Sequence, residues 1–246
     1  MPDAADQQQP LTAPVDPRRR EQRTVVAVLV VLVGVAVARG ALDSDQLYFF
    51  GAAVPSIILH EVSHGAVAFV FGDDTAKRAG RLTLNPIAHI DLFGTLLMPA
   101  MLVFAGVRPI GFAKPVPVNV SRLRHPRNHS LLVGLAGPTT NYLIAGIAAV
   151  LVHSVHHNGW WLQTLISVGT VNVLLGTFNL LPIPPLDGSS VLERLLPQSL
   201  WPQYLKFRRY SMPLLLGVVF LVPGAFQRIY EPVLRVWASI AGLHFS

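Results

Sequence analysis

The sequence contains the pentapeptide His60-Glu61-Val62-Ser63-His64, which has the pattern H-E-x-x-H. In an α-helix, residues four apart lie on one face, so His60 and His64 can offer two ring nitrogens to one metal ion. Glu61 would then stand beside a bound water, whose pKa zinc lowers to about 7, and would remove its proton. The pattern predicts metal-assisted hydrolysis. The plain alternative is a pair of core histidines and a solvated glutamate.

A third metal ligand has to come from elsewhere in the chain. The sequence has no cysteine, so the ligands must be histidine and carboxylate. Catalytic zinc sites usually have three protein ligands and a water, and Asp187 is the best candidate for the third, because this lone carboxylate follows more than twenty uncharged residues. The prolines before it break a helix, and Gly188 permits a close approach. The alternative for Asp187 is an ordinary helix-end residue.

The composition indicates that these residues lie in a membrane. Hydrophobic residues make up 52% of the chain and charged residues only 13%, whereas charged residues are about 25% of ordinary soluble domains. The formal net charge of +6 comes from short basic clusters beside apolar runs, which indicates membrane topology and no nucleic-acid partner. An ionisable residue inside a spanning helix costs about 2.5–3.5 kcal/mol and is usually functional. The membrane setting therefore favours the metal site over the core histidines.

We expect an all-α fold, a polytopic membrane helix bundle of about five to six spans. Residues 1–23 are rich in Gln, Pro and Asp and end on an arginine cluster, so we interpret them as a disordered basic N-terminal tail. Residues 24–246 are expected to form one integral membrane domain. Its catalytic core is expected at about residues 47–190.

The expected spans are apolar runs long enough to cross about 30 Å of hydrocarbon at 1.5 Å per residue. They are residues 24–38, 47–71, 131–152 and 161–186. The first run could be a cleaved signal peptide, but we favour an uncleaved helix. Residues 212–223 and 229–243 are weaker segments, either a tilted helix pair or one span plus an interfacial amphipathic helix.

Residues 92–105 are expected to form a re-entrant element between the second and third spans. This stretch is apolar, but it contains Gly94 and Pro99 and is too short for a usual span. Lys and Arg, which are in excess in cytoplasmic loops, cluster on both of its flanks. A single crossing cannot have both ends on one side, so the segment should enter the membrane and return. Asp187 would then lie at the depth of the H-E-x-x-H motif.

Further motifs follow in a characteristic order. They are Gly137-Pro138-x-x-Asn141 and the block Asn-x-x-Pro-x-x-Pro-x-Asp-Gly at residues 179–188. With H-E-x-x-H, they make the sequence resemble the site-2 protease family of intramembrane zinc metalloproteases. Residues 84–91 and 111–117 also resemble a compact bacterial branch of that family, without a PDZ domain.

The resemblance implies that His60, His64 and Asp187 hold one Zn²⁺ per chain and that Glu61 is the general acid/base. Asn179 would bind the substrate backbone or stabilise the oxyanion. The implied function is intramembrane proteolysis, the cleavage of transmembrane segments in membrane-protein substrates. The implied location is the bacterial cell membrane, in contact with lipid, in a multi-pass protein whose active site faces the cytoplasmic side.

Two other classes of function compete with this prediction. A zinc-binding membrane protein without protease activity is the first alternative, but a pure binding site needs no general base, so Glu61 argues against it. A transporter that uses the carboxylates as an ion path fits the intramembrane charges. It leaves the helical spacing of His60 and His64 unexplained.

Overall fold

The computed structural model of the chain describes residues 43–89, 114–154, 159–222 and 224–243, together with residues 27, 31 and 34. The chain divides into a unit of Met1–Ala41 and a unit of Leu42–Ser246. The three described residues of the first unit are helical. The predicted tail of residues 1–23 and the predicted re-entrant segment 92–105 lie outside the described residues, and the fold below is that of the second unit.

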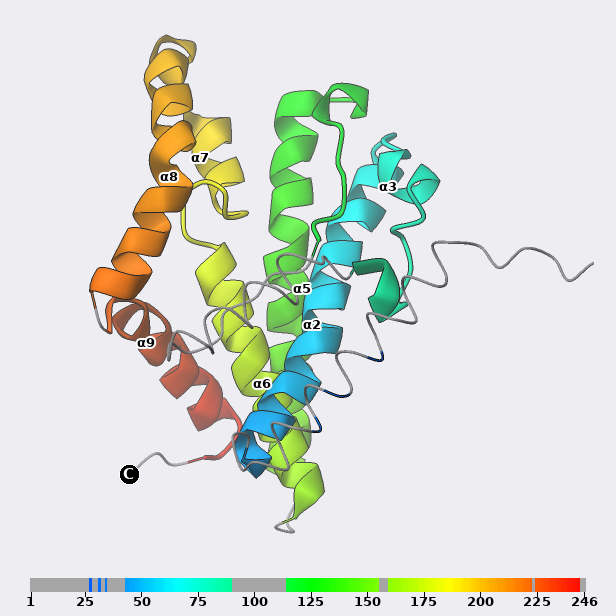
Figure 1. Cartoon of the computed structure of the whole chain (residues 1–246), viewed down its shortest axis with the longest axis vertical. Helices are drawn as coiled ribbons and strands as arrows, with labels where there is room; N and C mark the ends of the chain where they lie inside the picture. The colour runs from blue at the N-terminus through cyan, green and yellow to red at the C-terminus, as the bar shows by residue number, and fades with distance from the viewer. Residues whose placement is uncertain are drawn as a thin grey trace, which may run out of the picture. The chain divides into compact units, whose positions relative to one another are not determined.

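The described part of the second unit is helical and contains no β-strand, which confirms the predicted all-α class (Figure 1). The long helices are α2 (Ser44–Val70), α5 (Pro126–Ser154), α6 (Trp160–Asn179), α8 (Trp201–Leu221) and α9 (Ala225–Ile240). The short ones are α3 (Thr75–Arg78), α7 (Ser189–Leu195) and the 3₁₀ turns η1 (Pro86–His89), η3 (Val120–Arg122) and η4 (Gln198–Leu200).

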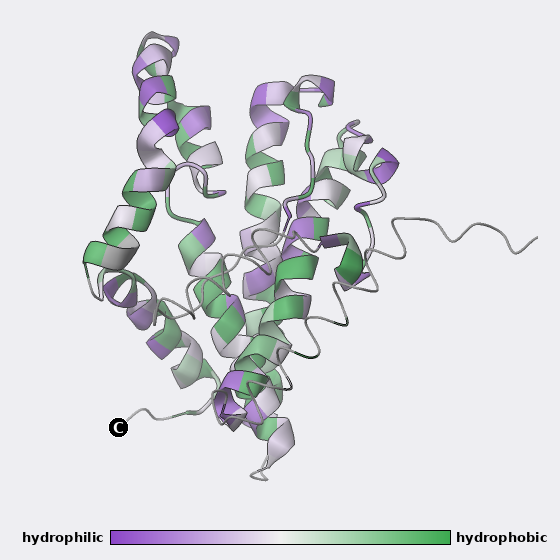
Figure 2. Ribbon diagram, in the orientation of Figure 1, coloured by the Kyte–Doolittle hydropathy of each residue, from purple (hydrophilic) through white to green (hydrophobic). Residues whose placement is uncertain are grey.

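Helices α2, α5 and α6 are long and apolar enough to cross a membrane. They correspond to the predicted spans 47–71, 131–152 and 161–186, and they pack side by side (Figure 1). Figure 2 shows apolar residues along the middle of these helices, whereas hydrophilic residues gather at the ends of α5 and α8 that lie uppermost in the view. Three of the predicted five to six spans therefore have membrane-spanning character within the described residues.

The end of α6 differs from the predicted span of residues 161–186. The helix ends at Asn179, and residues 180–188 form turns. Proline has no backbone N–H and its ring clashes with the preceding turn, so three prolines within four residues, Pro182, Pro184 and Pro185, strongly disfavour a continued helix. The apolar composition of this stretch extended the prediction beyond the point where the prolines end the helix.

The C-terminal segments also differ from their predicted bounds. Residues 212–223 were expected to form a short element, but they belong largely to α8, which begins at Trp201 and carries basic residues in its first half. Helix α9 replaces the predicted segment 229–243, and an ion pair of 2.5 Å joins Glu231 to Arg235 on its exposed side. Among the described residues, neither helix is both long and apolar enough to count as a membrane span.

Small side chains allow α5 to pack closely in this bundle. Ala145, Ala148 and Ala149 are buried in a cluster that also contains Trp237 of α9. The indole N–H of Trp237 donates a hydrogen bond of 2.7 Å to the Ala145 carbonyl. Membrane helices associate through such small residues because their backbones can approach closely. This packing fixes α9 against the helices that form the site.

Candidate metal centre

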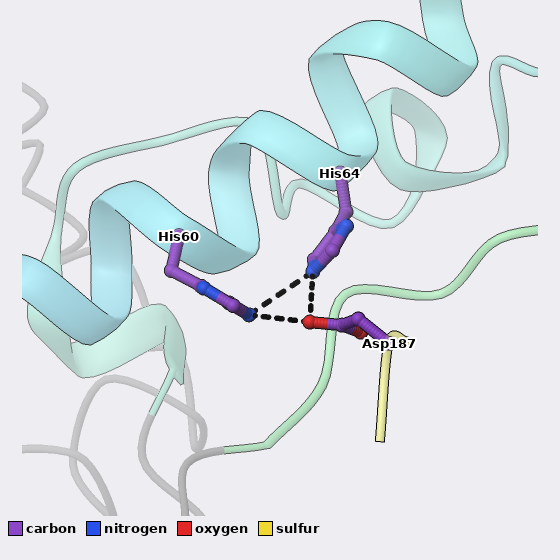
Figure 3. A group of neighbouring side chains, drawn as sticks. All are labelled: His60, His64 and Asp187. Atoms are coloured by element: carbon purple, nitrogen blue, oxygen red, sulfur yellow. Dashed lines mark hydrogen bonds and ion pairs between the residues drawn. The ribbon is translucent and has the colours of Figure 1, made fainter. Parts of the chain in front are cut away.

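His60, His64 and Asp187 meet at one point in the structure. Both histidines project from the same face of α2, as the four-residue spacing predicts, and both are buried. The Asp187 Oδ2 atom lies 3.0 Å from His60 Nε2 and 3.3 Å from His64 Nε2. The two Nε2 atoms are 3.1 Å apart. Figure 3 shows the three side chains pointing toward one another.

The loop after α6 carries Asp187 back to the end of that helix. The backbone N–H of Gly188 donates a hydrogen bond of 2.7 Å to the Asn179 carbonyl, which closes the loop. A Cβ atom at Gly188 would lie 2.6 Å from the carbonyl oxygen of Leu181, so only glycine fits there without displacement. The prolines end α6, and the bond from Gly188 to Asn179 brings the chain back to the end of that helix. The Asp187 carboxylate therefore lies against the histidines of α2.

The backbone of α5 passes close to the two histidine rings at Gly137. A Cβ atom at this position would lie 2.5 Å from His64 Nε2 and 2.6 Å from His60 Nε2. No real side chain tolerates such contacts. The glycine of the Gly137-Pro138-x-x-Asn141 motif therefore leaves the space in which the two Nε2 atoms can face Asp187.

Each histidine is oriented through its other ring nitrogen. His60 Nδ1 lies 2.6 Å from Asn141 Oδ1, and His64 Nδ1 lies 2.6 Å from the Val133 carbonyl oxygen. Oxygens of these kinds only accept, so both Nδ1 atoms carry the proton and both Nε2 atoms present a lone pair. Such partners on the second ring nitrogen are the usual companions of metal-ligating histidines.

The three facing atoms fit a metal ion in number, type and spacing. Asp187 Oδ2 is buried and accepts no hydrogen bond, so three lone-pair atoms converge at 3.0–3.3 Å with no donor between them. Ligand atoms in a tetrahedral zinc site with bonds of about 2.0–2.1 Å are about 3.3–3.4 Å apart. A cation at the centre would relieve the repulsion among these atoms with little movement of the side chains.

The three facing groups are two imidazoles, each with its proton on Nδ1 and its Nε2 lone pair toward the centre, and one carboxylate. An ionised carboxylate and two neutral imidazoles are the forms that bind a metal.

Glu61 follows the first histidine on the same helical turn and is half-buried. Its Oε2 atom accepts a hydrogen bond of 2.8 Å from the backbone N–H of Val116. Val116 belongs to the non-helical stretch 114–119, which runs beside α2. This bond ties the carboxylate to a second segment of the chain.

Asn179 is the last residue of α6. Its side-chain amide donates a hydrogen bond of 2.9 Å to the Leu175 carbonyl of its own helix. Its backbone carbonyl accepts the bond that closes the Asp187 loop. The predicted contact of Asn179 with a substrate stays a prediction.

Two buried residues near the site were not predicted from the sequence. Asn172 of α6 and Ser56 of α2 form side-chain hydrogen bonds that lead to Asn141. The sequence carried a signal for each, because Ser56 lies one turn before His60 and Asn172 is an isolated amide in an apolar run. The role of the Val133 carbonyl had no sequence signal, since every residue has one.

Comparison with known proteins identifies the family. The model of peptidase family M50 matches residues 153–223, which include Asp187. YwhC of Bacillus subtilis, named as a zinc metalloprotease, is 38% identical over 185 residues, which cover 72% of this chain and 81% of YwhC. The chain belongs to peptidase family M50. This M50 membership confirms the resemblance to the site-2 protease family that the motifs predicted.

Two other relatives are matched over about half of their own length or less. Rip2 of Mycolicibacterium smegmatis is 33% identical over 141 residues, which cover 56% of this chain and 53% of Rip2. MJ0392 of Methanocaldococcus jannaschii is 25% identical over 176 residues, which cover 70% of this chain and 41% of MJ0392. Both are named as zinc metalloproteases, in agreement with the predicted enzyme class. No solved structure shows a significant match to the chain.

Proposed function

We propose that this protein is an intramembrane zinc metalloendopeptidase that cleaves transmembrane segments of membrane-protein substrates. The observation that carries the proposal is the convergence of His60 Nε2, His64 Nε2 and Asp187 Oδ2 at 3.0–3.3 Å, while the Nδ1 atom of each histidine faces an acceptor. Two of these ligands belong to a helix with membrane-spanning character. Membership of a peptidase family supports the hydrolytic part of the proposal.

Each residue of the site has a distinct part in the proposed reaction. Zinc held by His60, His64 and Asp187 supplies Lewis acidity for attack by water on a peptide carbonyl. Glu61 accepts the proton of the attacking water and returns it to the leaving amine, as a general acid/base. Asn179 binds the substrate backbone or stabilises the oxyanion. The amides of a transmembrane helix are hydrogen-bonded and shielded, so the substrate must unwind before it reaches these groups.

The cytoplasmic orientation of the site is supported by the basic residues at one end of the bundle. Arg78 after α2 and Arg122 before α5 both pair with Asp74, at 3.0 and 3.1 Å. Arg127 at the start of α5 donates hydrogen bonds to the carbonyls of Arg194 and Leu196, which follow the Asp187 loop. Cytoplasmic loops are rich in Lys and Arg, so this end of the bundle is proposed to face the cytoplasm.

The experiment separates a protease from a protein that only binds zinc. Cells that carry the native chain are compared with cells that carry Glu61→Gln, and fragments of membrane proteins are identified by proteomics. The glutamine cannot accept the water's proton, so the variant should keep its zinc and lose the fragments. Fragments at the native level in Glu61→Gln cells would refute the mechanism.

The metal content of the purified protein tests the site itself. We expect one Zn²⁺ in the native chain and in Glu61→Gln. Zinc and cleavage should both be lost in Asp187→Ala. Full zinc occupancy and activity in Asp187→Ala would show that another residue is the third ligand.

A further inference from the structure

A line of buried polar side chains leads from His60 into the packed centre of the bundle. Asn141 of α5 and Asn172 of α6 are 0% exposed, and Ser56 of α2 is 3% exposed. These helices are the three that pack side by side in Figure 1. Polar groups are costly in a membrane interior unless they are paired. The proposed reaction uses none of the three residues directly.

The hydrogen bonds along this line all run in one direction. Asn172 Nδ2 lies 2.8 Å from the Val168 carbonyl oxygen, which can only accept, so this atom must be the amide nitrogen. The other side-chain atom of Asn172 is then Oδ1, and it accepts a bond of 2.8 Å from Asn141 Nδ2. This leaves Asn141 Oδ1 facing His60 Nδ1 at 2.6 Å.

The hydroxyl of Ser56 is consistent with the same direction. Its hydrogen is donated to the Ala52 carbonyl at 2.7 Å, so the oxygen is free to accept. It accepts the second bond of Asn172 Nδ2, at 2.8 Å. Two backbone carbonyls, at Ala52 and Val168, therefore determine the orientation of every amide and hydroxyl in the line.

Both histidines of the site have an acceptor opposite Nδ1, but the two acceptors are of different kinds. The Nδ1 atom of His64 faces a backbone carbonyl, which cannot turn into a donor. The Nδ1 atom of His60 faces an amide side chain, which could rotate by half a turn and present its NH₂ group instead. A donor at that position would move the histidine proton to Nε2, the atom that faces Asp187. The bond from Asn141 to Asn172 prevents this rotation.

We propose that Asn172, supported by Ser56, is a positioning residue that locks the Asn141 amide and so keeps His60 Nε2 unprotonated for the metal. This inference rests on the proposed metal centre at His60, His64 and Asp187. Asn172 touches neither metal nor substrate, and it acts through Asn141 alone. Loss of the hydrogen-bond partner of a ligating histidine typically reduces metal affinity by about 10- to 100-fold, and Asn172 holds such a partner, Asn141.

The test measures zinc affinity in the purified full chain, by titration of Zn²⁺ against a competing chelator. Asn172→Leu and Asn172→Ala both remove the acceptor of Asn141, the first with similar volume and the second with less. Each should weaken zinc binding by about 10- to 100-fold. Asn172→Asp keeps an acceptor oxygen toward Asn141, and its buried carboxyl group should be protonated and donate to the Val168 carbonyl as the amide does. This conservative variant should bind zinc more tightly than Asn172→Leu and Asn172→Ala.

Thr177→Val is the matched control. Thr177 shares α6 with Asn172 and makes a hydrogen bond of 2.8 Å to Tyr142 of α5, so the variant removes a polar link between the same two helices. It should lower the unfolding temperature without changing zinc affinity, because this link does not reach His60. If Asn172 had a purely structural role, zinc affinity would fall together with the unfolding temperature in every variant, including Thr177→Val.

The outcomes separate this inference from the proposed function. If the native chain binds no zinc, the metal centre is wrong and the inference falls with it. If the native chain binds zinc and both the Leu and Ala variants bind it equally well, only the role of Asn172 is overturned. The same conclusion follows if Thr177→Val loses as much affinity as Asn172→Ala at equal stability, or if Asn172→Asp fails to restore binding.

Discussion

The carboxylate of Glu61 accepts a hydrogen bond of 2.8 Å from the backbone N–H of Val116, a residue 55 positions later in the chain. The donor stands between Pro115 and Pro117, neither of which has a backbone N–H. Val116 is therefore the one residue of this tripeptide that can hold the proposed general base from the main chain. The bond joins α2 to a non-helical segment and restricts where the carboxylate can turn.

Replacement of Val116 by proline removes this single donor. Hydrogen bonds to charged groups contribute about 1.5–3 kcal/mol, so kcat of Val116→Pro should fall roughly 10- to 150-fold while zinc content is unchanged. Peptide hydrolysis and metal analysis on the same preparation provide the measurement. Val116→Ala keeps the N–H and serves as control, with activity close to native. Equal losses in both variants would mean that side-chain packing, and not the N–H, is what matters.

Gly137 provides a steric test of the metal centre. A Cβ atom here would lie 2.5 Å from His64 Nε2, so Gly137→Ala should displace a proposed ligand. A misplacement of about 1 Å can cost about 100-fold in rate, and zinc occupancy should fall as well. Gly146→Ala, on the same helix with nothing within 4 Å, should keep both. Native zinc binding in Gly137→Ala would contradict the geometry of the site.

Asp73, just after α2, gives the fold a pH dependence outside the membrane-spanning helices. Burial raises the pKa of Asp73, but hydrogen bonds from Thr75 and Asn119 outweigh it and lower the pKa below its usual value. Stability from this group is therefore present above the unfolded-state pKa of about 3.9 and is lost as the pH falls through the lower, folded-state value.

Thermal unfolding as a function of pH measures this contribution. Asp73→Ala should lose about 3 kcal/mol near pH 7 and should show a weaker dependence on pH below about 4. The neighbouring Asp74 forms exposed ion pairs, so Asp74→Asn should cost less than about 1 kcal/mol. If the unfolding temperature of Asp73→Ala falls below about pH 4 as steeply as that of the native chain, other carboxylates control acid unfolding.

Cysteine labelling tests the topology in this naturally cysteine-free chain. The backbone N–H of Lys114 donates a hydrogen bond of 3.0 Å to the His89 carbonyl, so the chain leaves and returns to the described structure at one place. Single cysteines at Lys77 and Arg122 should therefore react with an impermeant reagent from the same side, and by the positive-inside tendency that side is the cytoplasm. Reaction of the two positions from opposite sides would refute the re-entrant prediction for residues 92–105.

Most of the site was predictable because its signals are local. The spacing of His60 and His64 follows from helical geometry, and the absence of cysteine limits the remaining ligands. Asp187 was predictable because a carboxylate after a long uncharged, proline-rich stretch is unusual. The all-α class and the spans of α2, α5 and α6 followed from runs of apolar residues, which report burial in lipid irrespective of tertiary contacts.

The hydrogen bonds and close contacts between residues that are distant in sequence were visible only in the tertiary structure. The Val133 carbonyl and the Val116 N–H act through backbone groups, which every residue has, so the sequence gives no sign of them. Gly137 belongs to a motif that is visible in the sequence, but only the structure shows that its missing side chain leaves room for the two histidines. The tautomer that we propose for His60 follows from the direction of hydrogen bonds that begin at the Val168 carbonyl, on a different helix. Composition specified which segments are apolar enough to span a membrane. Only the packing of the helices determined which atoms face one another, because hydrogen-bond direction and close approach depend on three-dimensional geometry.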